Sequence, residues 1–131
     1  MTNAVTAIPA AAATEAEAHF ARRLSLETDC ADVQAAAFDN PGFVLLDVRG
    51  PNAFARGHLP GALNLPHREM EAARMAKWPE ETLFVVYCAG PHCNGADRAA
   101  LRLARLGRPV KIMIGGVTGW QDEGFALESG R

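Results

Sequence analysis

Hydrophobic positions in the middle of the chain form short continuous runs, each followed by turn residues. The runs cover residues 43–48, 82–87 and 110–114, with a shorter candidate at residues 62–65. A continuous apolar run of this length is typical of a strand that is buried on both faces, as in a parallel sheet. We therefore expect these segments to be strands of one parallel sheet.

Helical periodicity fills the segments between the runs. The clearest helix follows Gly95 and ends at Gly107, with small apolar residues on one face and arginines on the other. Another is predicted over residues 33–38, beginning at Asp29 or Asp32 and ended by an Asn-Pro-Gly turn. Strands that alternate with helices indicate an α/β fold.

The N-terminal part of the chain is rich in alanine. Residues 1–13 have neither a basic start nor a long hydrophobic segment, so we expect a disordered arm and not a secretory signal or a membrane span. From Thr14, a candidate N-cap, helical spacing places Phe20 and Leu24 on one face. We expect this helix to dock on the body, as an extra N-terminal helix of a single domain over residues 14–131.

Composition limits the classes of function. The chain has 131 residues, 49% of them hydrophobic, which is enough for one core. Its 13 basic residues nearly balance 15 acidic ones, so no overall field attracts nucleic acid or an anionic membrane. Three cysteines in a chain of this size favour free thiols in a reducing compartment, the cytoplasm.

Candidate chemistry lies between the second strand and the clearest helix. In an open parallel sheet, ligands bind beyond the carboxyl ends of the strands, where loops and helix N-termini converge. Glycines there can direct backbone N–H groups toward an anion, and a helix N-terminus favours a thiolate over a thiol. The loop consists of Cys88, Ala89, Gly90, Pro91, His92, Cys93, Asn94 and Gly95. The sequence therefore predicts an anion-binding loop with Cys88 as its nucleophile.

Further segments occur with this loop in a characteristic order. They are residues 45–49, residues 54–62, the strand end Val-Val-Tyr-Cys at Cys88, and Gly115 and Gly116 before Trp120. Together they resemble the signatures of the rhodanese-like domain family over roughly residues 30–127. The resemblance implies a three-layer α/β sandwich with a central, mainly parallel sheet of about five strands flanked by helices.

The same resemblance implies a thiosulfate sulfurtransferase whose nucleophile follows the strand directly, as Cys88 does. Its thiolate takes the outer sulfur of a donor such as thiosulfate as a persulfide and passes it to cyanide, a small thiol or a protein acceptor. No cofactor and no metal is implied, and the oligomeric state stays open. The candidate substrate-binding residues are Ala89, Gly90, Pro91, His92, Asn94, Gly95 and Arg49.

A second thiol, Cys93, distinguishes this loop, which is two residues longer than is usual in the family. Because Cys93 lies nearer the helix start, it is an alternative nucleophile or a resolving thiol for Cys88. The two can approach within disulfide range, but we expect them reduced at rest because a bond closes the substrate cradle. A non-catalytic or redox-sensing module that uses this pair is the alternative function.

Two other site types fit less well. Cys88, His92 and Cys93 could all ligate zinc, but the sequence offers no second ligand pair near them. A phosphatase loop of the related fold places five residues between cysteine and arginine. Here nine residues separate Cys88 from Arg98 and four separate Cys93 from it, so we expect Arg98 on the solvent face of its helix.

Some polar and aromatic residues are predicted to be structural. Asp47 ends an apolar strand, so its carboxylate needs a partner, which Arg49 can supply. His58 is expected to be hydrogen-bonded within a loop, and Trp120 to pack in the core. Cys30 lies in a different segment and is expected to take no part in thiol chemistry.

Overall fold

The computed structural model describes residues 3–36 and 41–130. Its centre is a five-stranded sheet in the order β1-β5-β4-β2-β3, and every strand pairing is parallel. The strands are β1 (Glu27–Thr28), β2 (Val44–Asp47), β3 (Leu63–Asn64), β4 (Phe84–Tyr87) and β5 (Val110–Met113). The predicted three-layer α/β architecture is thereby confirmed.

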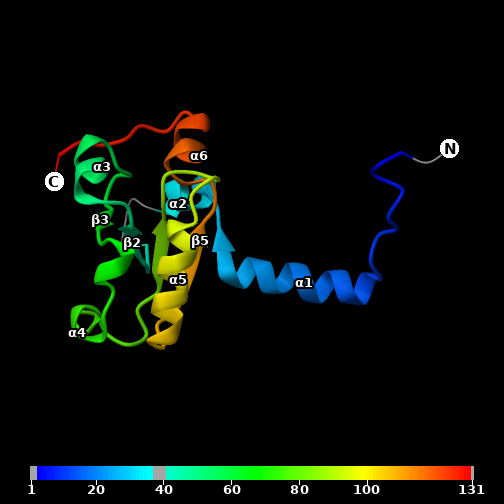
Figure 1. Ribbon diagram of the computed structural model, residues 1–131, viewed down its shortest axis with the longest axis horizontal. Coiled ribbons are helices and arrows are strands. Elements are labelled where there is room, and N and C mark those ends of the chain that lie inside the picture. Colours follow the sequence, from blue (N-terminus) through cyan, green and yellow to red (C-terminus); the bar gives the residue numbers. More distant parts are fainter. Residues whose placement is uncertain (1–2, 37–40, 131) are drawn as a thin grey trace.

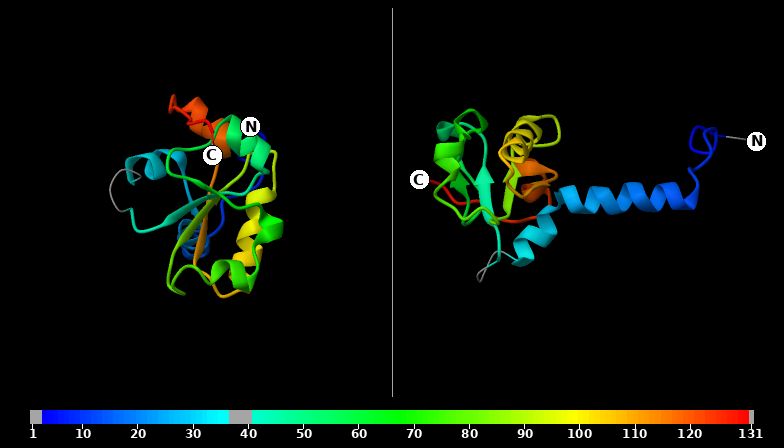
Figure 2. Two further views of the ribbon diagram at one scale, coloured as in Figure 1. Left: turned by 90° about the vertical axis from the view of Figure 1, so that its left-hand side faces the viewer. Right: turned by 90° about the horizontal axis from the view of Figure 1, so that it is seen from below.

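Helices cover both faces of the sheet, as Figure 1 and the left view of Figure 2 show. The helices are α1 (Ala13–Leu26), α2 (Cys30–Ala36), α3 (Pro51–Arg56), the 3-10 helix η1 (His67–Glu69), α4 (Ala72–Met75), α5 (Gly95–Arg105) and α6 (Gly116–Asp122). Side chains of α4 and α5 pack in one core cluster, and those of α2, α3 and α6 in a second cluster on the opposite face. The end of the helix predicted over residues 33–38 lies outside the described residues.

The two clusters explain why the strands read as continuous apolar runs. Along β4, Phe84 and Val86 point into the first cluster, whereas Val85 and Tyr87 point into the second. All four are almost fully buried. Burying each such side chain contributes about 1.5–3 kcal/mol, so a polar residue on either face of this strand would lower the stability of the fold.

Helix α5 forms as its sequence pattern predicts. Ala96, Ala99 and Leu103 are buried against the sheet, and the arginines of the helix are exposed. The chain leaves the helix through Gly107, whose φ of 77° is the left-handed conformation that glycine adopts at little cost. The amino end of α5 is therefore held beside the end of β4.

Strand β1 was not predicted, because its two residues are polar and only half-buried. It pairs with β5 through the register of Glu27 with Ile112. Helix α2 follows at once, and the Oδ1 atom of Asp29 accepts a hydrogen bond from the backbone N of Asp32 at 2.8 Å. Asp29 is thus the capping residue of the two that the sequence offered.

The prediction that the N-terminal helix docks on the body is wrong. Helix α1 has no buried residue, and Phe20 and Leu24 are 55% and 74% exposed. It extends away from the body (Figure 1 and the right view of Figure 2) and begins at Ala13 without a side-chain cap from Thr14. Its alanine-rich surface offers little to bury, and other helices already cover both sheet faces. Disorder of residues 1–13 stays a prediction.

Candidate active site

The loop after β4 carries Cys88 at the carboxyl end of the sheet, as predicted. Cys88 is 7% exposed and belongs to the core cluster on the α5 side. The start of α6 braces this end of the loop, because the N–H of Val117 donates to the carbonyl of Cys88 and the N–H of Thr118 to that of Ala89. The first residues of the loop are therefore fixed to the body.

Gly116 makes this close approach possible. Its φ is 60°, and a Cβ atom there would lie 2.5 Å from the carbonyl oxygen of Cys88 and 2.8 Å from the backbone N of Gly90. Only glycine tolerates both the left-handed conformation and the contact with backbone atoms. The sequence signature formed by Gly115 and Gly116 thus has a direct role in shaping the loop.

Cys88 and Cys93 are joined by a disulfide, with their Cα atoms 6.5 Å apart. The approach of the two residues is confirmed, but the expectation that they are reduced at rest is wrong for this structure. A turn in which the N–H of Cys93 donates to the carbonyl of Gly90 brings the second sulfur back over the first. Gly95 packs against both, since a Cβ there would lie 2.8 Å and 3.4 Å from the Sγ atoms of Cys88 and Cys93.

Two cavities adjoin this sulfur pair. The larger, about 560 Å³, lies toward β2, α3 and η1 and is lined by Arg49, His67 and Arg68 among others. The smaller, about 250 Å³, lies toward β5 and is lined by Pro91 and Ile112 among others. Both Cys88 and Cys93 line each cavity, so a donor or acceptor can reach the sulfur atoms from two sides.

Basic side chains lie on and near the wall of the larger cavity. Burial, together with the charges of Arg102, Arg68 and Arg98, holds the pKa of His67 below its ordinary value. Arg102 also contacts η1, because its Nη1 atom donates to the carbonyl of Arg68 at 3.4 Å. The charged residues that line the cavity are Arg49, which is paired with Asp47, Arg68 and the acidic Glu69.

A buried polar network supports the same strand ends. Asp47 is fully buried, and its carboxylate accepts hydrogen bonds from the Nε and Nη2 atoms of Arg49 and from the hydroxyl of Tyr87. The Tyr87 hydroxyl accepts a further bond from the N–H of Leu59 at 3.1 Å. Burial and the carboxylate of Asp47 raise the pKa of Tyr87, and hydrogen bonding to Asp47 raises that of Arg49 against the effect of burial. The expected pairing of Asp47 with Arg49 is confirmed.

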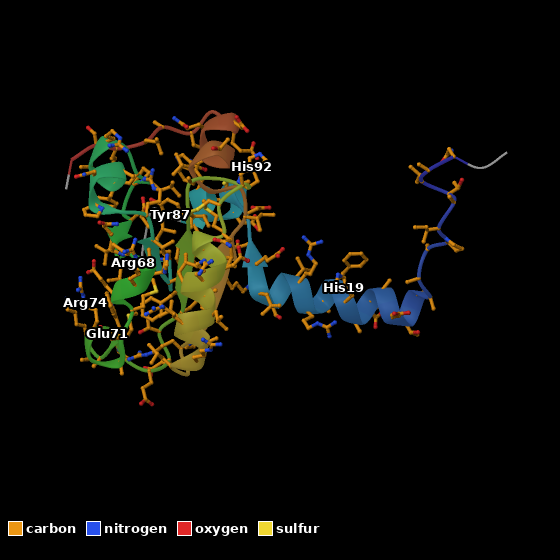
Figure 3. The ribbon with its side chains drawn as sticks, viewed as in Figure 1. His19, Arg68, Glu71, Arg74, Tyr87 and His92 are labelled. Atoms are coloured by element: carbon orange, nitrogen blue, oxygen red, sulfur yellow. A yellow bond between two sulfur atoms is a disulfide. The ribbon has the colours of Figure 1, made fainter. Side chains whose placement is uncertain are left out.

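The other candidate binding residues fall into three groups. Ala89, Gly95 and Arg49 line the larger cavity, although the guanidinium of Arg49 is held by Asp47 and by the carbonyl of Gly57. Gly90 and Pro91 line the smaller one. His92 and Asn94 are exposed and line neither; Figure 3 shows His92 at the edge of the body near α6 and Tyr87 inside it.

Several structural interpretations are confirmed. Arg98 is exposed on α5 and donates to the Oδ1 atom of Asn94. His58 is buried, stacks on Phe54 with ring centroids 3.7 Å apart, and bonds through Nδ1 to the carbonyl of that residue. Trp120 is buried and its indole N–H donates to the carbonyl of Ala126.

The third cysteine packs against the start of α6, where its Sγ atom donates to the carbonyls of Ile114 at 3.5 Å and of Gly116 at 3.8 Å. Cys30 belongs to the core cluster on the sheet face opposite to Cys88. Burial and the carboxylates of Asp29 and Glu123 raise its pKa to about 11, so it is a thiol at neutral pH.

In the described part of the chain, no three His, Cys, Asp or Glu residues are placed to hold a metal ion. No helix there has the length and apolarity needed to cross a membrane.

His67 and Arg68 are site residues that sequence reasoning missed. They come from η1, about twenty positions before the loop, and reach it only because α5 contacts η1 in the folded chain. The sequence shows the adjacent basic residues His67 and Arg68, but nothing local connects this pair to Cys88.

Comparisons with known proteins agree with this geometry. A family model described as "Rhodanese-like domain" matches residues 30–123. The chain is 38% identical over 66% of its length to the HTH-type transcriptional regulator Rv0324 of Mycobacterium tuberculosis and spans 38% of that protein. It is 36% identical to the thiosulfate sulfurtransferase GlpE of Pseudomonas entomophila, over 67% of this chain and 79% of that protein.

A solved structure matches most of the chain. The BH2092 protein of Bacillus halodurans superposes with a TM-score of 0.83 and 34% identity, over 88% of this chain and 85% of that one.

Proposed function

The chain belongs to the rhodanese-like domain family, and from this premise we propose that it is a sulfurtransferase that carries sulfane sulfur on Cys88. The donor is a small anion such as thiosulfate, and the acceptor is cyanide, a small thiol or a thiol of another protein. One observation carries the proposal: Cys88 lies at the carboxyl end of β4, between two cavities of which the larger is lined by the basic residues Arg49 and Arg68.

The chemistry needs only groups that the chain supplies. The thiolate of Cys88 attacks the outer sulfur of thiosulfate, the bond between the two donor sulfurs breaks, and sulfite leaves with the electron pair. Within the described residues, the backbone N–H groups of Ala89 and Gly90 donate to no protein acceptor, and these residues line the larger and the smaller cavity respectively, so each N–H is available to an anion. An acceptor then attacks the outer sulfur of the persulfide and restores the thiolate.

The disulfide sets a condition on this activity. A cysteine bonded to Cys93 has no thiolate, so the oxidised form described above is inactive until a reductant opens the bond. Reducing conditions suit this requirement, and the cytoplasmic location inferred from cysteine usage stays part of the proposal.

The test is sulfur transfer from thiosulfate to cyanide by the reduced protein, followed as thiocyanate. We expect activity in the wild type, loss of activity in Cys88→Ser, and an adduct of a single sulfur atom on the peptide with Cys88 after exposure to thiosulfate alone. An adduct on the Cys93 peptide in place of Cys88, with activity retained in Cys88→Ser, would move the nucleophile to Cys93. Absence of any adduct and of thiocyanate would refute the proposed function.

A second candidate is a redox-sensing module without transfer activity. The disulfide favours it, because a reversible bond between a buried and an exposed cysteine can report oxidant. The similarity to a transcriptional regulator concerns only 38% of that protein. A sensor would form and lose the disulfide reversibly while giving no thiocyanate in the same assay.

A further inference from the structure

We propose that Cys93 attacks the persulfide on Cys88 and forms a disulfide with Cys88. The protein thereby releases the sulfane sulfur as sulfide, and external thiols are oxidised when they reduce the disulfide. This inference rests on the proposed function and extends it to a thiol-dependent reductase activity. The observation behind it is the disulfide itself, which shows that the two sulfur atoms come within bonding range on an otherwise folded loop.

The positions of the two cysteines suit unequal roles. Cys88 is buried at the strand end, where a donor reaches it through either cavity. Cys93 is exposed at the outer side of the loop, directly before α5. A small nucleophile on the loop itself is always present at high effective concentration, so it competes with acceptors that must diffuse in.

The step balances as follows. The thiolate of Cys93 attacks Sγ of Cys88, the bond between that atom and the outer sulfur breaks, and the outer sulfur takes a proton from water and leaves with the electron pair as hydrosulfide. The new bond is the disulfide seen in the structure. The sulfane sulfur is reduced to sulfide and the two cysteines are oxidised. A small dithiol or a dithiol protein then reduces the disulfide and restores both thiols.

Local groups favour both the attack and the departure. The backbone N–H of Gly95 donates to Sγ of Cys93 at 3.4 Å, and α5 directs its positive end toward the same atom, which stabilises a thiolate there. The leaving hydrosulfide is an anion, and the larger cavity beside Cys88 is lined by Arg68. Gly95 leaves room for both sulfur atoms, since a Cβ at that position would contact each of them.

A merely protective disulfide makes a different prediction. If Cys93 only shields an oxidised Cys88, the bond forms with peroxide but not with thiosulfate, and no sulfide appears. If Cys93 resolves the persulfide, thiosulfate alone, without any oxidant, converts the reduced protein into the disulfide form. Sulfide release and thiol loss with thiosulfate therefore separate the two roles.

The experiment is a single turnover of the full chain. Reduced protein, freed of reductant, receives thiosulfate without cyanide, and sulfite, sulfide, free thiols and intact mass are measured. The wild type is expected to release sulfite and sulfide in equal amounts and to lose two thiols, giving the disulfide mass. Cys93→Ser is expected to release sulfite but at least about tenfold less sulfide, because its persulfide has no internal attacker.

Cys30→Ser is the matched control, since it removes the third thiol, keeps a hydrogen-bond donor toward the carbonyls of Ile114 and Gly116, and should behave as the wild type. Cys93→Ala repeats the main variant with a different side chain at an exposed position. A lasting persulfide in the wild type, or sulfide release from both Cys93 variants equal to that of the wild type, would overturn the inference and leave sulfur transfer intact. Absence of sulfite and of any adduct would overturn the proposed function and this inference together.

Discussion

Replacing Tyr87 by phenylalanine tests whether the buried network fixes the strand end that carries Cys88. The change deletes one oxygen atom and preserves the ring, which is fully buried. That oxygen donates to Asp47 at 2.8 Å and accepts from the N–H of Leu59 at 3.1 Å. No other acceptor for the Leu59 N–H exists among the described residues.

Two costs follow from the deletion. Losing a hydrogen bond to a charged group costs about 1.5–3 kcal/mol, and leaving the Leu59 N–H buried without an acceptor costs about 1–3 kcal/mol. Asp47 keeps its hydrogen bonds from Arg49, and the energetic costs of losing two hydrogen bonds in one network do not add fully. We therefore expect Tyr87→Phe to lower the free energy of unfolding by about 2–4 kcal/mol.

The assay is equilibrium unfolding in urea of the reduced protein. With a slope near 2 kcal/mol/M, the midpoint should fall by about 1–2 M without a change in slope. Ser25→Ala is the matched control, because it also deletes a hydroxyl with a hydrogen bond but lies exposed on α1, and it should shift the midpoint little. A loss in Tyr87→Phe below about 0.5 kcal/mol would refute the reasoning, since surface changes cost as little.

Three further predictions concern other parts of the molecule. Removing residues 1–24 should change the melting temperature by less than about 3 °C, because α1 has no buried residue. A larger fall would show that the helix packs against the body in solution. In the reduced protein, Cys30 should resist alkylation until the pH approaches 11 or the chain unfolds, as its raised pKa keeps it a thiol below that range; rapid labelling at pH 8 would contradict its burial. Gly116→Ala should cost about 2–5 kcal/mol through backbone strain and collision with the loop, whereas Gly50→Ala, with open space around it, should not; equal midpoints would refute the account.

The sequence predicted those elements whose signal is local and strong. Strands β2 and β4 are predicted by apolar runs because they are buried on both faces, and β5 by a similar run although three of its four residues are only half-buried. Helix α5 is predicted by its buried alanines. Strand β1 is two polar residues long, and only its partner β5 makes it a strand. The exposure of Phe20 could not be predicted either, because it depends on helices elsewhere having already covered the sheet.

Within the site, the sequence identified the loop but not the disulfide between its two cysteines. The positions of Cys88 and Gly116 follow from strand order and glycine chemistry, which are readable along the chain. Whether Cys93 turns inward depends on the side-chain geometry of a single turn, which no periodicity encodes. The place of Arg68 beside the loop arises from a contact between segments far apart in the sequence, so it can be seen only in the folded chain.

The loop after β4 has an inner part that is fixed to the body and an outer part that is exposed. Residues 88–90 are anchored to the start of α6 by backbone hydrogen bonds and the close contact with Gly116, whereas residues 91–94 are exposed and are hydrogen-bonded to Gly90 and to the first turns of α5. Opening or closing the disulfide can therefore displace the outer part while Cys88 keeps its place on the sheet. The same division means that the outer part can lengthen, or carry a residue other than cysteine at position 93, without moving the residue at the strand end.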